Sequence, residues 1–150
     1  MAKERMMPAE QIPKPSCTTA VVIAVMAHAP LASALEEVAE HVFGESVDIT
    51  AIDVLPGACA ADSTGALVTR LSELDRGAGV LLLTDLPGAS PANICATSRS
   101  ALLKKTIGCT VITGVNVSML LRVLNYRHRP LDELAQQAIE GGRQTIARLT

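Results

Sequence analysis

Three polar side chains in this sequence stand at or shortly after the ends of apolar segments, and their types suit nucleophilic chemistry. His28 follows the apolar run Ala20–Ala27, Asp85 follows Val80–Thr84, and Ser90 lies five residues further on. A carboxylate that accepts a hydrogen bond from one imidazole nitrogen leaves the lone pair of the other nitrogen free. The same carboxylate stabilises the ring when it becomes positively charged. His28 is therefore a candidate nucleophile or general base, and Asp85 is the candidate residue that orients it.

The residues after Asp85 add a candidate anion-binding loop. Ser90-Pro91 is typical of a helix start, with Ser90 as the cap and Pro91 just inside the helix. Backbone N–H groups at a helix start are unpaired and attract anions. Gly88 and Ala89 are small residues, which leave these N–H groups accessible. A nucleophilic nitrogen with a carboxylate behind it and oxygen-binding donors in front favours phosphoryl transfer. The sequence contains no GxxxxGK(S/T) loop, which argues against a nucleotide as the phosphoryl donor.

Apolar runs alternate with segments of helical periodicity along the chain, which is the pattern of an α/β protein. After His28, apolar residues recur at Leu31, Leu35, Val38 and Val42, the spacing of one helix face. The expected strands cover residues 20–27, 47–55, 80–84 and 109–113, and the expected helices cover residues 30–43, about 62–74, 90–103, 117–125 and 131–140.

Capping and breaking residues predict several helix boundaries. Asp62 or Ser63 is the expected cap of the second helix, and Asn116 is the expected cap of the fourth. Gly141-Gly142 is expected to break the fifth helix. The tail, residues 143–150, fits either a helix or a short alternating strand.

Four strands that alternate with helices predict a doubly wound, mainly parallel four-stranded sheet with helices on both faces. The expected strand order is 2-1-3-4, in which the first and third strands are neighbours and the order reverses between them. Ligands bind at such a switch point, in the crevice outside the carboxyl ends of the strands. We therefore expect His28 and Asp85 to face each other across this crevice.

The composition narrows the class of protein. The chain has 150 residues, of which 49% are hydrophobic and 1% aromatic, and its formal net charge is −2. A domain of this length can bury a substantial core, which must be built from aliphatic side chains. The acidic balance and the lack of aromatic residues argue against nucleic-acid binding. No apolar run reaches the length of a membrane-spanning helix, so we expect no direct membrane insertion.

The N-terminal segment and the cysteines suggest where the protein works. Residues 1–18 carry charges and prolines but no apolar signal segment, so we expect a disordered leader and a single domain over residues 19–150. Cys17, Cys59, Cys95 and Cys109 have no metal-binding spacing, and they predict free thiols. We expect a cytoplasmic protein that uses no metal and no other cofactor.

Four segments of the chain resemble the IIA component of the mannose-type (mannose/fructose/sorbose) phosphotransferase system. They are VMAHAPLASAL around His28, DVLPGACAADS at residues 53–63, LLLTDLPGASPAN at residues 81–93 and TGVNVSMLLRVL at residues 113–124. The resemblance runs from about Val21 to the C-terminus, and its last two segments are the most specific. Ala27, Ala29 and Pro30 depart from the family pattern, in which Ser or Thr commonly precedes the histidine and Gly follows it. The loop also reads GASP where some members have GGSP.

This resemblance implies a phosphohistidine carrier. His28 would accept a phosphoryl group from the phosphocarrier HPr and pass it to a IIB partner, in phosphoenolpyruvate-dependent sugar uptake or its regulation. Asp85 matches the aspartate that hydrogen-bonds the histidine, and Ser90 matches the serine of the GxSP loop that helps to hold the phosphoryl group. The family is usually a homodimer in which a C-terminal strand crosses to the other subunit, a role that residues 143–149 would fill.

Other interpretations of the same residues stay open at this point. A non-catalytic regulatory module of flavodoxin-like shape, which signals by binding another protein, would use the same fold. A small hydrolase built on His28, Asp85 and Ser90 fits less well, because Pro91 suits a helix start better than a strained nucleophile elbow. Asp53 invites comparison with a phosphoaspartate at a strand end, but paired acids that would bind magnesium after the first strand are missing.

A few further residues are assigned by position alone. Leu86, Pro87 and Met119 are candidates for an apolar shoulder on which a partner docks. His41 lies in the first expected helix and His128 lies between two arginines, so both are expected to be structural or solvated.

Overall fold

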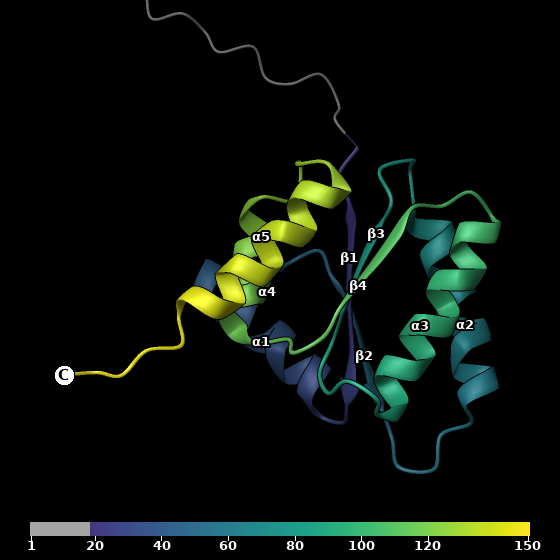
Figure 1. Cartoon of the computed structure of the whole chain (residues 1–150), viewed down its shortest axis with the longest axis horizontal. Helices are drawn as coiled ribbons and strands as arrows, with labels where there is room; N and C mark the ends of the chain where they lie inside the picture. Colours follow the sequence, from purple (N-terminus) through teal and green to yellow (C-terminus); the bar gives the residue numbers. More distant parts are fainter. Residues whose placement is uncertain (1–18) are drawn as a thin grey trace, which may run out of the picture.

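A four-stranded parallel sheet forms the centre of the molecule (Figure 1). The structure is a computed structural model that describes residues 19–150, and the predicted leader, residues 1–18, lies outside the described residues. The strands are β1 (Val22–His28), β2 (Thr50–Val54), β3 (Val80–Thr84) and β4 (Cys109–Ile112). Their order is β2-β1-β3-β4 and every neighbouring pair is parallel, so the predicted doubly wound topology is confirmed.

Helices cover both faces of this sheet. The helices α1 (Leu31–Phe43), α4 (Val117–Asn125) and α5 (Leu131–Gln144) lie on one face, and α2 (Ala60–Leu74) and α3 (Ser90–Lys104) lie on the other (Figure 1). Because the strands are parallel, their carboxyl ends meet at one edge of the sheet, beside the N-termini of the helices that follow them. We call this the carboxyl edge. Within residues 19–150, none of the helices combines the length and the apolar character needed to cross a bilayer.

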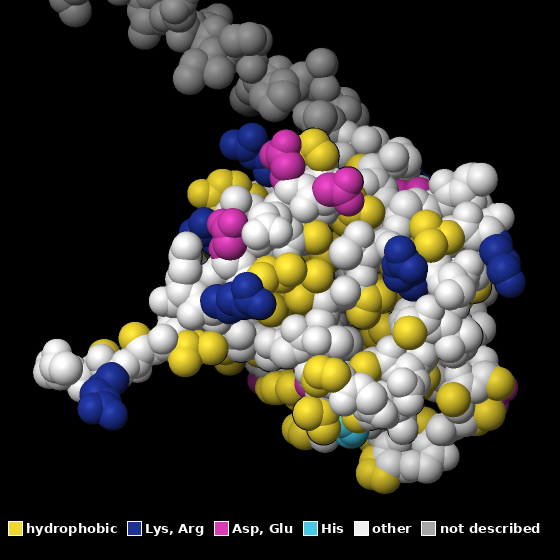
Figure 2. All heavy atoms as spheres, viewed as in Figure 1, with side chains coloured by type: hydrophobic (Ala, Val, Ile, Leu, Met, Phe, Trp, Pro, Cys, Tyr) yellow, Lys and Arg dark blue, Asp and Glu magenta, His cyan; other side chains and the backbone are white. Residues whose placement is uncertain are grey.

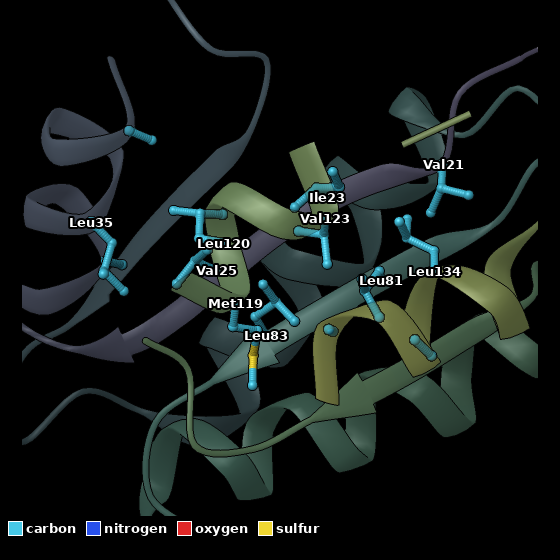
Figure 3. Close-up of a cluster of buried hydrophobic side chains, with 14 of the residues drawn as sticks. Val21, Ile23, Val25, Leu35, Leu81, Leu83, Met119, Leu120, Val123 and Leu134 are labelled. Carbon is cyan, nitrogen blue, oxygen red and sulfur yellow. The ribbon is translucent and has the colours of Figure 1, made fainter. Parts of the chain in front are cut away.

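Aliphatic side chains fill the two layers between the sheet and the helices. Successive residues of β1 point to opposite faces, so that Val25 packs with α1, α4 and α5 while Met26 packs with α2 and α3. Figure 3 shows the first of these clusters, in which Leu35, Leu120 and Leu134 from three different helices converge on the strands. The single Phe and the single Tyr of the chain are both exposed. The predicted aliphatic core is therefore confirmed.

Two strands differ from their predicted bounds. β1 begins and ends later than expected, so His28 is the last residue of the strand rather than the residue after it. β2 covers five residues, Thr50–Val54, where nine were expected. Before the strand, Asp48 contacts a different segment: its backbone oxygen and its carboxylate accept hydrogen bonds of 3.1 and 3.0 Å from the Arg127 guanidinium.

The helix starts show which caps were predicted correctly. Asn116 caps α4 as expected, since its side chain accepts a 3.0 Å hydrogen bond from the Met119 amide. The predicted caps of α2 are wrong, because the helix begins at Ala60 with Cys59 as its N-cap. The predicted cap of α3 is displaced by one position: Ala89 has the extended N-cap conformation, so Ser90 is already the first helical residue.

The fifth helix contradicts the prediction that two glycines break it. α5 continues through Gly141 and Gly142 to Gln144. Both glycines are buried, and a Cβ atom at Gly141 would lie 2.7 Å from the Cβ of Arg122 in α4. The glycines therefore let α5 approach α4 closely instead of ending the helix. Residues 145–150 form neither a helix nor a strand within this single chain.

Candidate functional site

The structure brings His28 and Asp85 together at the carboxyl edge, as the strand order predicted. β1 and β3 are neighbours, and the Nδ1 atom of His28 lies 2.7 Å from the Oδ2 atom of Asp85. The same Oδ2 atom accepts a 2.9 Å hydrogen bond from the His28 backbone N–H. An ionised carboxylate can only accept hydrogen bonds, so Nδ1 carries the hydrogen and Nε2 of the neutral ring keeps its lone pair.

The His28 ring is open to solvent while its partner is sheltered. The side chain of His28 is 52% exposed and that of Asp85 is 15% exposed. Among residues 19–150, no side chain or backbone group forms a hydrogen bond with Nε2. A half-exposed imidazole with one nitrogen held and the other free can attack an electrophile that another molecule presents at the surface.

Several donors hold Asp85 in its charged form. Burial favours the neutral acid, but the hydrogen bonds from the backbone and ring of His28 and from the Leu86 amide outweigh it. The pKa of Asp85 therefore lies below its ordinary value. The Leu86 N–H donates to Oδ1 at 2.7 Å, so each carboxylate oxygen has its own partners. This charge remains available to stabilise a positively charged His28 ring.

The start of α3 leaves hydrogen-bond donors free at the same edge. No side chain caps this helix, and Ser90 and the exposed Gly88 make no hydrogen bond through their own N–H groups within residues 19–150. The Ala89 N–H is already engaged, since it donates to the Leu86 oxygen at 3.2 Å. Gly88 has a φ of +81°, a left-handed conformation that favours glycine in this turn. Unpaired amides at a helix N-terminus attract anions.

Asp53 has a role that the sequence analysis missed. Its carboxylate binds the start of α1. It accepts hydrogen bonds from the Ala32 N–H at 2.9 Å, the Ser33 N–H at 3.2 Å and the Ser33 hydroxyl at 2.6 Å. The available signal was indirect: Pro30, before the helix, has no side chain that can cap it.

The surface of the carboxyl edge is apolar and almost free of charge. The loops and helix starts at this edge, residues 29–35, 54–61, 86–93 and 113–121, contain no Lys, Arg, Asp or Glu. Exposed apolar side chains from the starts of helices and the loops before them surround the site: Leu31, Leu55, Leu86 and Val117. In Figure 2, hydrophobic side chains gather at the lower end of the molecule, where β1 terminates in Figure 1.

Not every predicted contact residue belongs to this surface. Leu86 is 61% exposed and Pro87 is also exposed, which fits their assignment to a docking shoulder. Met119 does not fit, because only 4% of it is exposed and it packs in the core between α4 and the sheet. His41 and His128 are both exposed, and neither forms an ion pair within 4 Å in the described part of the chain.

The two buried thiols offer no second nucleophile. Burial raises the pKa of the Cys95 thiol to about 12 and that of the Cys109 thiol to about 11, so neither forms a thiolate near neutral pH. Cys59 is exposed and free, and Cys17 lies outside the described residues. No group of three or more His, Cys, Asp or Glu side chains within residues 19–150 could hold a metal ion.

Comparisons with known proteins bear on both the fold and the site. Residues 21–139 match the family described as "PTS system fructose IIA component". The chain is 35% identical over 131 residues to the "PTS system mannose-specific EIIAB component" of Escherichia coli strain K12, and the alignment covers 86% of this chain and 39% of that protein. The same values hold for the corresponding protein of Shigella flexneri. The chain thus spans about two fifths of the length of the curated relatives it matches.

Solved structures share the fold at low sequence identity. The mannose/sorbose specific IIA subunit of the phosphotransferase system from Enterococcus faecalis has a TM-score of 0.77 at 19% identity, over 87% of this chain and 96% of that one. The phosphotransferase system component EIIA from Streptococcus agalactiae has a TM-score of 0.75 at 23% identity, over 85% and 96% of the two chains. These similarities confirm the doubly wound α/β architecture.

Proposed function

The chain belongs to the mannose-type IIA family of the phosphotransferase system, and from this membership we propose that it is a phosphohistidine carrier. His28 accepts a phosphoryl group from phospho-HPr and passes it to a IIB protein. Residues 19–150 act as one IIA domain. The EIIAB name of the Escherichia coli relative fits a relay from an A component to a B component.

One observation carries this proposal: the 2.7 Å contact between His28 Nδ1 and Asp85 Oδ2 on a ring that is 52% exposed. The contact leaves Nε2 as the nucleophile and directs it outward. A histidine that served only the core would be buried, and one that served only solubility would need no carboxylate behind its ring. Both features together suit a group that must react with two visiting proteins.

The transfer itself is a displacement at phosphorus. The Nε2 lone pair of His28 forms a new N–P bond while the bond between phosphorus and the donor breaks, and the bonding electrons leave with the donor. The Nδ1 hydrogen stays between the ring and Asp85, whose negative charge offsets the positive charge that develops on the imidazole. The reverse displacement, with a IIB nucleophile as attacker, returns His28 to its neutral form.

Groups at the start of α3 hold the phosphoryl oxygens in this proposal. Ser90 contributes its N–H and its hydroxyl, and Gly88 contributes its N–H. Ala89 acts differently, because its N–H is already bound to the Leu86 oxygen; its small side chain keeps the approach open. The low charge of the surrounding loops leaves these dipoles as the main attraction for an anion.

Partner proteins dock on the exposed apolar surface around the site, with Leu86 and Pro87 as its shoulder. The pathway served is phosphoenolpyruvate-dependent sugar uptake or its regulation, in the cytoplasm where phospho-HPr is available. Apolar side chains exposed at the edge of a reactive site are typical of a surface that another protein covers.

We also propose that the protein is a homodimer in which the C-terminal tail pairs with β4 of the other subunit. β4 is an edge strand, and unpaired edges attract further strands. Ile146 and Leu149 of the tail are 82% and 97% exposed. A cavity of about 390 Å³ between β4 and the end of α5 offers space for apolar side chains. Sedimentation of the full chain against a chain lacking residues 145–150 tests this: we expect a dimer and a monomer, and a monomer in both would contradict it.

The carrier function is tested by mass. The protein is incubated with phosphoenolpyruvate, enzyme I and HPr, and its intact mass is measured before and after acid treatment. We expect one acid-labile phosphoryl group, which is lost in His28→Ala. His41→Ala and His128→Ala are matched controls, since they remove the other histidines of the chain, and both should still be phosphorylated. An unchanged mass in the wild type would favour the purely regulatory binding module.

A further inference from the structure

Asp53 lies on the opposite side of β1 from Asp85, and its carboxylate is the cap of a helix in another part of the chain. The side chain is half-buried at the end of β2, twenty residues after Ser33. It accepts two backbone N–H groups and one hydroxyl at the start of α1. The residue at the N-cap position, Pro30, supplies no side-chain cap. β2 therefore provides the acceptor that the local sequence of α1 lacks.

The end of β2 also forms hydrogen bonds with the backbone that directly follows His28. In the parallel register, Ala27 pairs with Asp53 and His28 pairs with Val54. The Ala29 N–H donates to the Val54 oxygen at 3.1 Å. The turn between His28 and α1 is thus attached to two consecutive residues of β2, through the backbone at its beginning and through a carboxylate at its end.

The imidazole of His28 is consequently positioned from two directions. Asp85 fixes the ring and the backbone N–H of His28 from the β3 side. Asp53 fixes the first turn of α1 from the β2 side and makes no hydrogen bond with His28 itself. Loss of the second attachment would let the turn shift relative to Asp85, and a displacement of about 1 Å at a reacting group can cost roughly 100-fold in rate.

The carboxylate of Asp53 also distinguishes α1 from α3. A negative charge on the N-terminal amides of α1 satisfies these donors and offsets the positive end of the helix dipole. The start of α3 has no such side chain. With α1 occupied, its N-terminal amides do not compete with those of α3 for a phosphoryl group on His28.

We propose that Asp53 is a positioning residue for His28: by capping α1 across the sheet, it sets the direction of the reactive nitrogen relative to Asp85 and the start of α3. The proposal rests on the proposed carrier function of His28. It adds a residue whose contribution passes through backbone geometry and not through contact with the reacting atoms.

The test compares four variants in two measurements on the full chain. The variants are Asp53→Ala, Asp53→Asn, Ser33→Ala and the control Asp62→Ala, which removes an exposed carboxylate from the first turn of α2 at the same edge. The first measurement is the rate of phosphorylation by phospho-HPr. The second is the ¹⁵N spectrum of the His28 ring in the unphosphorylated protein, which reports its tautomer and hydrogen bonding.

We expect Asp53→Ala to lower the phosphorylation rate by roughly 10- to 100-fold and to disturb the ring signals of His28. Asp53→Asn should restore both, because asparagine caps a helix about as well as aspartate. Asp62→Ala should match the wild type. Wild-type rate and ring signals in a folded Asp53→Ala protein would overturn the proposal, and so would a failure of asparagine to rescue.

Two further outcomes remain decisive. If Asp53→Ala does not fold, Ser33→Ala gives the answer, since it removes only the hydroxyl, which lies 2.6 Å from Asp53 Oδ2 and 3.0 Å from the Pro30 oxygen. A smaller decrease of about 2- to 5-fold in rate with shifted ring signals would support the proposal, and no change in either would refute it. If the wild type takes up no phosphoryl group, the carrier function fails, but the ring signals of the variants still show whether Asp53 positions His28.

Discussion

Two carboxylates flank β1, one at the end of β2 and one directly after β3, and they bind different kinds of group. Asp53 binds the amides of α1 and the Ser33 hydroxyl, which would keep the same protons and charge during the proposed phosphoryl transfer. Asp85 binds the ring of His28, whose charge would change on the proposed phosphorylation of Nε2. The β2 side therefore needs oxygen atoms in the correct place, whereas the β3 side also needs a negative charge.

Replacement of each aspartate by asparagine should give the largest difference in phosphorylation rate between the two sides. We expect Asp85→Asn to lower the phosphorylation rate by roughly 100-fold or more, because the neutral amide cannot stabilise a positive imidazole and can stabilise the wrong tautomer. Asp53→Asn should stay within a few-fold of the wild type. Rapid-quench measurements with phospho-HPr give both rates. Equal losses in the two variants would show that the two sides do not differ in this way.

A negative charge introduced on the β3 side of the site should weaken binding of phospho-HPr more than one introduced on the β2 side. Leu86 on the β3 side and Leu55 on the β2 side are exposed to similar extents, 61% and 65%. We expect Leu86→Glu to raise the apparent KM for phospho-HPr by about 10-fold, since a buried unpaired charge opposes docking. Leu55→Glu is the matched control and should have a smaller effect. If Leu55→Glu raised the KM more than Leu86→Glu, the docking surface would have to be assigned to the β2 side.

Ser90 allows activity and stability to be compared within the β3 side. Its hydroxyl forms no hydrogen bond within the described residues, and Ala89 occupies the N-cap position. We expect Ser90→Ala to slow transfer by about 10-fold, the value of one hydrogen bond to a charged group. Its thermal unfolding midpoint should stay close to that of the wild type. A large fall in the midpoint would instead assign Ser90 a structural role.

The smallest expected effect is a pH dependence of stability that comes from Asp85. Its pKa is below the ordinary 3.8 in the folded protein, so the charged form adds stability above that pH, and this stability is lost as the pH falls through the folded value. The difference in unfolding free energy between wild type and Asp85→Asn should therefore shrink below about pH 3.8. Urea unfolding at pH 7 and at pH 3 measures it, and a difference that grows at pH 3 would contradict the assigned charge.

The sequence was sufficient for the elements whose signals are local. The continuous apolar run Val80–Thr84 is strand β3 with the predicted bounds, and Asn116 caps α4 as predicted. The contact between His28 and Asp85 followed from the strand order, because the carboxyl ends of neighbouring parallel strands meet at one edge. These inferences need only the spacing of apolar residues, the identity of a capping residue and a rule of sheet topology.

Features that depend on contacts between distant segments were not predictable in the same way. The cap of α1 comes from Asp53 in another strand, and no local pattern indicates which acceptor a helix will meet in three dimensions. Gly141 was expected to break α5 because glycine weakens helices, but its contact with Arg122 shows that it permits close packing. The same residue type serves both purposes, and only the neighbouring helix distinguishes them.

A single oxygen atom of Asp85 binds both the main chain and the ring of His28. These two hydrogen bonds restrict rotation of the imidazole, so a phosphoryl group could enter and leave His28 from only one direction. Donor and acceptor proteins would then exclude each other, and turnover would follow ping-pong kinetics in which surplus unphosphorylated donor acts as a competitive inhibitor of the acceptor.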